Sequence, residues 1–141
     1  MTEGKRRVLL VDDEPSIIKL IGKRLEVSGF EVAVALDGQE ALDKVRTVHP
    51  DVIVLDLMLP RLSGLKVCAM LKHDPLYGHI PIVIFTGKGQ DVDEETCRKA
   101  GADAFVTKTE GADALLQQVE HHAARAAHAP PPSQTPPSQV G

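Results

Sequence analysis

The sequence predicts an α/β fold in which five helices cover a doubly wound, five-stranded parallel sheet. Short apolar, β-branched runs alternate along the chain with stretches of helical periodicity, which is the pattern of repeated βαβ units. Three of these runs are almost entirely apolar, as expected for strands that helices cover on both faces. The chain has 141 residues, of which 43% are hydrophobic, so it can bury one core but not two.

The five predicted strands are β-branched, apolar runs bounded by turn-forming or charged residues. They cover residues 6–11, 31–35, 52–55, 80–85 and 104–107. A right-handed crossover places the third strand beside the first.

Helical periodicity fills the intervals between these strands. The first helix starts at Pro15, a residue favoured in a first turn, and stops at a Ser-Gly pair. Apolar stripes at residues 41–48 and 67–71 predict the second and third helices. The fourth, residues 91–100, has the weakest apolar stripe and is therefore expected to be the most mobile. The fifth is predicted from its apolar positions and from an Ala-rich stretch reaching residue 127.

We assign residues 1–128 to this domain and residues 129–141 to a Pro-, Ser- and Gln-rich tail. The tail has no apolar period, so we expect it to be disordered or polyproline-like. A solvated terminus is favoured over an SH3-type ligand on composition alone. No helix-turn-helix follows the domain, so direct DNA binding is not expected.

Charge and composition exclude several other classes of protein. The 16 basic and 20 acidic residues give a net charge of -4 without a dense basic cluster, so non-specific nucleic-acid binding is not indicated. Only a short apolar run follows the basic N-terminal residues, which predicts neither a secretory signal nor a membrane span, and hence a cytoplasmic protein. Cys68 and Cys97 lack metal-binding or redox spacing, so we expect two buried or semi-buried thiols.

Residues suited to phosphoryl transfer follow four of the predicted strands. Asp12 and Asp13 follow the first strand and Asp56 follows the third. Thr86 follows the fourth strand and Lys108 the fifth. Because the carboxyl ends of parallel strands share one edge of a sheet, these side chains are expected to converge in one crevice.

Three carboxylates in one crevice require a compensating positive charge. Two unit charges about 4 to 5 Å apart repel by roughly 3 to 4 kcal/mol at an effective dielectric of 20. Mg²⁺ is the predicted occupant, because it takes oxygen ligands and suits phosphate chemistry. At such a cation Asp56 is the best candidate nucleophile for forming an acyl phosphate. The Thr86 hydroxyl and the Lys108 ammonium would then stabilise two of the phosphoryl oxygens.

Four motifs together carry a resemblance to a known family. They are VLLVDDE at residues 8–14, DLMLPRLSG at 56–64, the segment 81–87, and AGADAFVTK at 100–108. With these motifs in this order at the strand ends, the chain resembles the response regulator receiver domain of two-component signalling over residues 5–127.

This resemblance implies a flavodoxin-like strand order of 2-1-3-4-5 and a definite set of roles. Asp56 would accept a phosphoryl group from a sensor histidine kinase or a histidine phosphotransfer protein. Asp12 and Asp13 would hold Mg²⁺ together with Asp56 and the backbone carbonyl of Met58. Such a domain catalyses its own phosphorylation and dephosphorylation and is not an enzyme acting on other substrates.

The resemblance also implies a conformational switch. Thr86 would turn toward the phosphoryl group, and the aromatic ring of Phe105 would swing inward into the released space. The altered surface of the fourth helix, fifth strand and fifth helix would be read by a downstream protein, which the sequence does not name. A local charge change would thus bias a bistable element.

Two positions depart from the family pattern. Thr109 stands where a proline usually follows the lysine, and a cis bond before a non-proline residue costs about 2.5 to 4 kcal/mol, so we expect a trans bond and a weaker or reshaped engagement of Lys108. Met58 offers no strong donor or acceptor to orient an attacking water, which predicts a long-lived phosphorylated state.

Three alternatives remain open at this point. Asp12 and Asp13 could instead cap the first helix. A phosphatase of the haloacid dehalogenase kind also uses an aspartyl phosphate, but it needs a second acid where this chain has Met58. A pseudo-receiver would keep the fold and bind proteins without phosphorylation; the complete acid set opposes this, whereas Thr109 favours it.

Overall fold

The computed structural model describes residues 5–87 and 93–128, in which five parallel strands form one sheet. Its strand order is β2-β1-β3-β4-β5, so the predicted doubly wound sheet and its order 2-1-3-4-5 are confirmed. The strands are β1 (Arg7–Val11), β2 (Glu31–Ala35), β3 (Val52–Leu55), β4 (Ile82–Thr86) and β5 (Ala104–Thr107).

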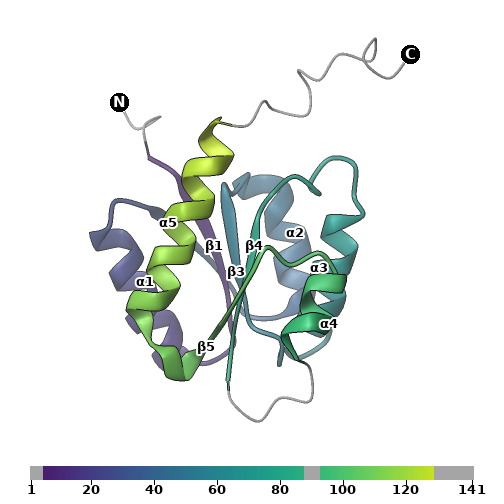
Figure 1. Ribbon diagram of the computed structural model, residues 1–141, viewed down its shortest axis with the longest axis horizontal. Coiled ribbons are helices and arrows are strands. Elements are labelled where there is room, and N and C mark those ends of the chain that lie inside the picture. Colours follow the sequence, from purple (N-terminus) through teal and green to yellow (C-terminus); the bar gives the residue numbers. More distant parts are fainter. Residues whose placement is uncertain (1–4, 88–92, 129–141) are drawn as a thin grey trace.

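Helices cover both faces of this sheet. Figure 1 shows α1 and α5 on one face and α2, α3 and α4 on the other. The helices are α1 (Pro15–Val27), α2 (Gly38–Val48), α3 (Gly64–Lys72), α4 (Glu94–Lys99) and α5 (Ala112–His128), and a short 3-10 helix, η2 (Lys108–Glu110), precedes α5.

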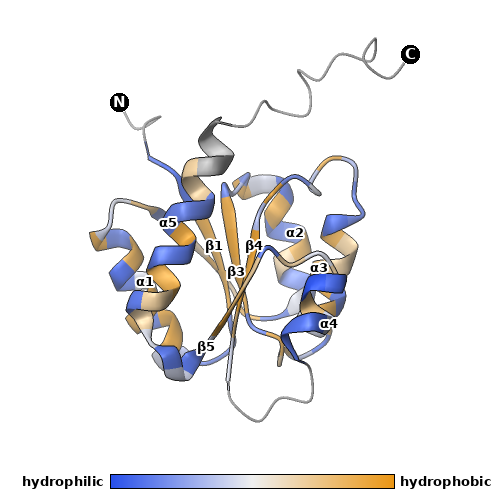
Figure 2. Ribbon diagram, viewed as in Figure 1, coloured by the Kyte–Doolittle hydropathy of each residue, from blue (hydrophilic) through white to orange (hydrophobic). Residues whose placement is uncertain are grey.

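The core consists of two apolar layers, one on each face of the sheet. Alternate residues of a strand point to opposite faces, so Leu10 packs in the α1 and α5 layer whereas Leu9 packs in the α2 and α3 layer. All four residues of β3 and all five of β4 are buried, as a central parallel strand requires. Figure 2 shows these strands as a continuous hydrophobic centre beneath helices with hydrophilic outer faces.

Side-chain caps fix where three of the helices begin. Asp37 accepts a hydrogen bond from the backbone N–H of Glu40 at the start of α2, and Ser63 accepts one from the N–H of Lys66 at the start of α3. Asp93 accepts a hydrogen bond from the backbone N–H of Thr96, so α4 begins at Glu94, the residue after Asp93. Such caps stabilise a helix by about 1 kcal/mol.

Element boundaries are where the sequence-based prediction needs correction. The fourth strand was expected over residues 80–85 but covers Ile82–Thr86, because the N–H of Ile80 bonds to the carbonyl of Tyr77 in a turn and Thr86 pairs with Thr107. The fourth helix is shorter than predicted; positions 91 and 92 of that prediction lie outside the described residues. The same holds for the predicted tail at residues 129–141.

Both cysteines lie in the layer between the sheet and the α3 and α4 helices. Cys68 and Cys97 are fully buried free thiols, so that prediction is confirmed. Burial raises the pKa of the Cys68 thiol to about 12. Among the described helices, none is both long enough and apolar enough to cross a membrane.

The sheet has two distinct ends. In Figure 1, β1 begins and α5 finishes near the top of the view, whereas the carboxyl ends of the strands point to the bottom. All of the residues predicted to carry chemistry follow or end strands, so they belong to this lower edge.

Candidate functional site

Three aspartates meet where β1 and β3 end. These strands are neighbours, and Val11 is paired with Leu55, so Asp12 and Asp56 leave the sheet at the same level. The backbone N–H of Asp56 donates to the carbonyl of Val11 over 3.0 Å, which continues the ladder by one residue. Carboxylate oxygens of Asp12, Asp13 and Asp56 lie within 4.8 Å of one another.

The three acids differ in their exposure. Asp12 is 2% exposed and Asp56 is 4% exposed, whereas Asp13 faces solvent. Burial raises the pKa of Asp12, although hydrogen bonds from the N–H of Glu14 and from Lys108 oppose that rise. An ionised Asp12 is therefore costly in this pocket unless positive charge accompanies it.

The Lys108 ammonium supplies positive charge from the far edge of the sheet. Its Nζ lies 3.0 Å from Oδ2 of Asp12, 3.3 Å from Oδ2 of Asp56 and 2.8 Å from Oε1 of Glu14. Burial lowers the pKa of Lys108, but hydrogen bonds to Glu14 and Asp12 and the charge of Asp56 outweigh burial and raise it. Lys108 therefore remains a cation at any physiological pH.

The fifth reactive group is a buried hydroxyl. Oγ1 of Thr86 donates a hydrogen bond of 3.0 Å to Oδ1 of Asp56, and the residue is 1% exposed. Thr86 ends β4, which lies between β3 and β5. The two oxygens of the Asp56 carboxylate thus have different partners: Thr86 on one side and Lys108 on the other.

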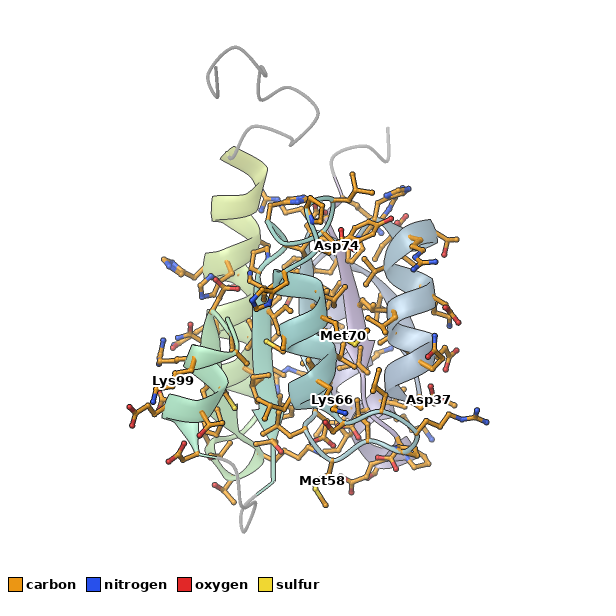
Figure 3. All side chains as sticks on the ribbon, turned by 90° about the vertical axis from the view of Figure 1, so that its right-hand side faces the viewer. Asp37, Met58, Lys66, Met70, Asp74 and Lys99 are labelled. Atoms are coloured by element: carbon orange, nitrogen blue, oxygen red, sulfur yellow. The ribbon has the colours of Figure 1, made fainter. Side chains whose placement is uncertain are left out.

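Two predicted residues lie at the margin of this pocket. Met58 donates its backbone N–H to Oδ1 of Asp56 over 3.4 Å, and the residue is 64% exposed. Figure 3 shows its side chain projecting from the lower end of the molecule. Phe105 is half-buried and packs against the layer beneath α3 and α4. The metal-binding role of the Met58 carbonyl and the switching role of Phe105 stay predictions.

Close backbone packing holds the loop between β3 and α3 against the site. A Cβ atom at Gly64 would lie 2.0 Å from the carbonyl oxygen of Asp56, so no larger residue fits there without movement. A Cβ atom at Gly38 would lie 2.2 Å from the carbonyl oxygen of Leu62. Arg61 adopts a φ of 70° in this loop and pairs with Asp37 across 3.3 Å. The loop is therefore tied to both α2 and β3.

The alternative of a simple helix cap is not what the structure shows. Glu14 is the N-cap residue of α1, and its side chain makes no capping hydrogen bond. Oδ1 of Asp12 accepts the N–H of Glu14 over 2.9 Å, which shapes the turn before the helix. Oδ2 of Asp12 contacts Lys108 instead.

One part of the expectation for Lys108 is confirmed. The described residues contain no cis peptide bond, so the bond between Lys108 and Thr109 is trans as predicted. Its ammonium reaches both Asp12 and Asp56, and the weaker or reshaped engagement expected relative to the family stays a prediction. The backbone of residues 108–110 forms η2.

The sequence analysis missed two acids of this site. Glu14 has the shortest of the three contacts with Lys108, and nothing in its local sequence indicates that partner. Glu110 accepts hydrogen bonds from the backbone N–H and the hydroxyl of Thr107. The sequence does contain a signal for this role of Glu110, because Thr-Lys-Thr-Glu at residues 107–110 is the S/T-x-x-E pattern of a capping box.

This arrangement suits a small, oxygen-seeking cation and a phosphoryl group. The three clustered carboxylates are of the type that Mg²⁺ prefers, and burial of Asp12 favours a bound positive charge. The hydroxyl and the ammonium beside Asp56 are donors for a group with several anionic oxygens.

The fold and the acidic pocket are those of a receiver domain. Residues 8–120 match the family described as response regulator receiver domain, and the chain belongs to that family.

Two curated relatives illustrate its breadth. The chain is 45% identical over 103 residues to the alkaline phosphatase synthesis transcriptional regulatory protein PhoP of Bacillus subtilis, covering 73% of this chain and 42% of PhoP. It is 34% identical over 117 residues to the polar-differentiation response regulator DivK of Brucella ovis, covering 83% of this chain and 95% of DivK. The chain thus spans less than half the length of PhoP and nearly the whole of DivK.

Solved structures show the same architecture. The BeF3-activated N-terminal receiver domain of RstA from Klebsiella pneumoniae aligns with a TM-score of 0.75 at 28% identity, covering 84% of this chain and 98% of that one.

Proposed function

We propose that this chain is a phosphoacceptor of two-component signalling, in which Asp56 takes a phosphoryl group from a phosphohistidine. The donor would be a sensor histidine kinase or a histidine phosphotransfer protein. The observation that carries this proposal is the placement of Thr86 and Lys108 on the two oxygens of a buried aspartate. Membership of the receiver family supports it independently.

The proposed step is an in-line displacement at phosphorus. A carboxylate oxygen of Asp56 forms the new bond to phosphorus, while the bond from phosphorus to the donor nitrogen breaks. The electron pair of the broken bond stays with the departing imidazole, which takes up a proton. Charge on the transferred oxygens is met by the Lys108 ammonium and the Thr86 hydroxyl, which already lie beside this carboxylate.

We propose that Asp12, Asp13 and Asp56, with the backbone carbonyl of Met58, hold Mg²⁺ during this step. When bound, the ion supplies positive charge to the phosphoryl oxygens and offsets the repulsion among the acids. The 4.8 Å clustering of the three carboxylates supports this assignment.

Phosphorylation is proposed to act by changing the surface that a downstream protein reads. Thr86 hydrogen-bonds Asp56 directly, and Phe105 lies on the neighbouring strand β5 with its side chain half-buried. A shift of the hydroxyl toward a phosphoryl oxygen would leave space beside that ring. We propose no turnover of an external substrate and no direct contact with DNA.

A phosphodonor of low molecular weight tests the proposal without a known kinase. With acetyl phosphate and Mg²⁺, the wild-type protein should gain the mass of one phosphoryl group, with acetate as the leaving group, and chelation of Mg²⁺ should prevent the gain. Asp56→Asn should show no gain, whereas Asp43→Asn, an exposed acid of α2, should behave as wild type. A full mass gain in Asp56→Asn, or none in wild type, contradicts the proposal.

The two competing interpretations predict different outcomes of this experiment. A pseudo-receiver would remain unmodified, and the contact of Lys108 with Asp56 supports the phosphoacceptor over that interpretation. A phosphatase would release phosphate repeatedly from phosphomonoesters. Met58 occupies the position where that class needs an acid, and its side chain cannot act as one.

A further inference from the structure

We propose that Glu110 is a positioning residue of the phosphoryl-transfer site, which holds the turn that aims Lys108 at Asp56. This inference rests on the proposed function. It concerns a side chain that touches neither the acids nor the position of a phosphoryl group.

The contacts of Glu110 join the two ends of the turn that contains Lys108. Its Oε2 accepts a hydrogen bond of 2.8 Å from the backbone N–H of Thr107 and one of 3.0 Å from the Thr107 hydroxyl. The hydroxyls of Thr107 and Thr109 lie 3.0 Å apart. The side chains of Thr107, Thr109 and Glu110 therefore form hydrogen bonds within the segment 107–110, whereas that of Lys108 does not.

The turn is also closed at its far end. The N–H of Gly111 donates to the carbonyl of Lys108 over 3.2 Å, and Gly111 has a φ of 94°, which favours glycine. Thr107 in turn is paired with Thr86 at the end of the sheet. The backbone on both sides of Lys108 is thus fixed relative to the hydroxyl that contacts Asp56.

The position of Lys108 in the sheet explains why its backbone direction matters. It follows β5, an edge strand two positions from β3 in the sheet order. With strands about 4.8 Å apart, the ammonium must cover roughly 10 Å laterally to meet Asp56. A small rotation of the backbone at Lys108 would therefore move the ammonium away from the Asp56 oxygen that it now approaches to 3.3 Å.

The exposures of Glu110 and Lys108 allow an effect on the position of Lys108 to be distinguished from an effect on the stability of the fold. Glu110 is exposed, so replacing it leaves no cavity in the core. The Lys108 side chain is only 15% exposed, so its release from the pocket is measurable. Replacement of Glu110 should therefore change mainly the position of the Lys108 side chain.

The first arm of the test follows Lys108 without using phosphorylation. The rate of acylation of its amine by a mild reagent is measured by peptide mass. Glu110→Ala should raise that rate about fivefold, which corresponds to losing one helix cap. Glu110→Gln should stay near wild type, because glutamine also serves in a capping box. Glu95→Ala, which removes an exposed acid of α4, is the matched control.

The second arm is a double-mutant cycle on the initial rate of phosphorylation by acetyl phosphate with Mg²⁺. Glu110→Ala should slow the reaction about fivefold in the wild-type background and not at all in the Lys108→Ala background. Urea unfolding of each variant checks that the fold is retained. Equal slowing in both backgrounds would overturn the proposal, because Glu110 would then act through something other than Lys108.

The two proposals fail in different ways. An unchanged acylation rate of Lys108 in Glu110→Ala overturns the positioning role, whatever happens to phosphorylation. A wild-type protein that is not phosphorylated overturns the proposed function, while the acylation arm still decides whether Glu110 holds Lys108.

Discussion

Oγ1 of Thr86 lies 3.0 Å from Oδ1 of Asp56 and donates its hydrogen to it, in a part of the molecule that solvent barely reaches. The hydroxyl comes from β4 and the carboxylate from the end of β3, so the contact joins two neighbouring strands. The group proposed to sense the phosphoryl group is therefore in contact with its acceptor before any transfer.

Removal of this hydroxyl should slow the proposed reaction. We expect Thr86→Ala to reduce the rate of phosphorylation by acetyl phosphate roughly tenfold, since one buried hydrogen bond of about 1.4 kcal/mol is lost in the transition state. Thr86→Ser keeps the hydroxyl and should retain most of the rate. Intact-mass time courses give both rates, and equal rates for the alanine variant and wild type would exclude this role.

The affinity for Mg²⁺ should depend on pH through Asp12. Burial raises the pKa of Asp12 above its ordinary value of 3.8, and a protonated carboxyl is a poor metal ligand. The Mg²⁺ affinity should therefore fall with decreasing pH sooner than an ordinary aspartate would predict. Calorimetric titrations between about pH 7 and pH 4.5 measure this.

The variant Asp12→Asn provides the control for that titration. It should bind Mg²⁺ more weakly at pH 7 and should lose the pH-dependent step contributed by Asp12. Without metal, the free energy of unfolding should show the opposite dependence on pH from this one group. Because the pKa of Asp12 is raised in the folded state, its ionisation lowers the free energy of unfolding as the pH rises through that pKa. A wild-type affinity that is constant over the whole range would contradict the assignment.

The lifetime of the phosphorylated state should depend on residue 58. The Met58 side chain is exposed beside Asp56 and has no strong hydrogen-bonding group, so it does little to orient an attacking water. Met58→Asn should shorten the half-life of the acyl phosphate, measured after removal of the donor. Met58→Leu is a matched apolar control that should keep the wild-type half-life. No difference between the asparagine and leucine variants would sink the idea.

A stability prediction concerns a contact far from the acids. Oδ2 of Asp103 accepts from Nζ of Lys72 over 2.9 Å and from the backbone N–H of Ile82 over 2.8 Å. The same ammonium donates to the carbonyl of Ile80, so the pair ties α3 to the start of β4.

Asp103→Ala should lower the free energy of unfolding by about 2 to 3 kcal/mol, because it leaves a half-buried ammonium and a strand N–H without their acceptor. Asp103→Asn keeps an acceptor for Ile82 and should cost less. Urea denaturation measures both. A loss below about 0.5 kcal/mol for the alanine variant would show that solvent replaces the contact.

The sheet and its reactive edge could be predicted because both depend on local patterns. Runs of β-branched residues are visible in sequence, and the residue that follows each run is fixed by the run itself. The convergence of Asp12 and Asp56 then follows from the strand order alone. The end of β4 was misplaced by one residue, because the pairing of Thr86 with Thr107 is a tertiary contact.

The remaining parts of the site depend on distances that a pattern does not contain. Glu14 and Lys108 are 94 positions apart, and only the folded sheet brings them together. Side-chain partners of this kind are set by packing.

The start of β1 and the end of α5 lie opposite the edge of the sheet that carries the acids, which has a practical consequence for reporting on the proposed reaction. Because β1 starts and α5 finishes at the pole remote from the carboxyl ends of the strands, a fluorescent tag or a neighbouring module joined there is attached far from Asp56 (Figure 1). A conformational change at Asp56 could be transmitted to that point of attachment through the strands or along α5. A reporter attached at the end of α5 therefore suits a measurement of long-range transmission within the domain.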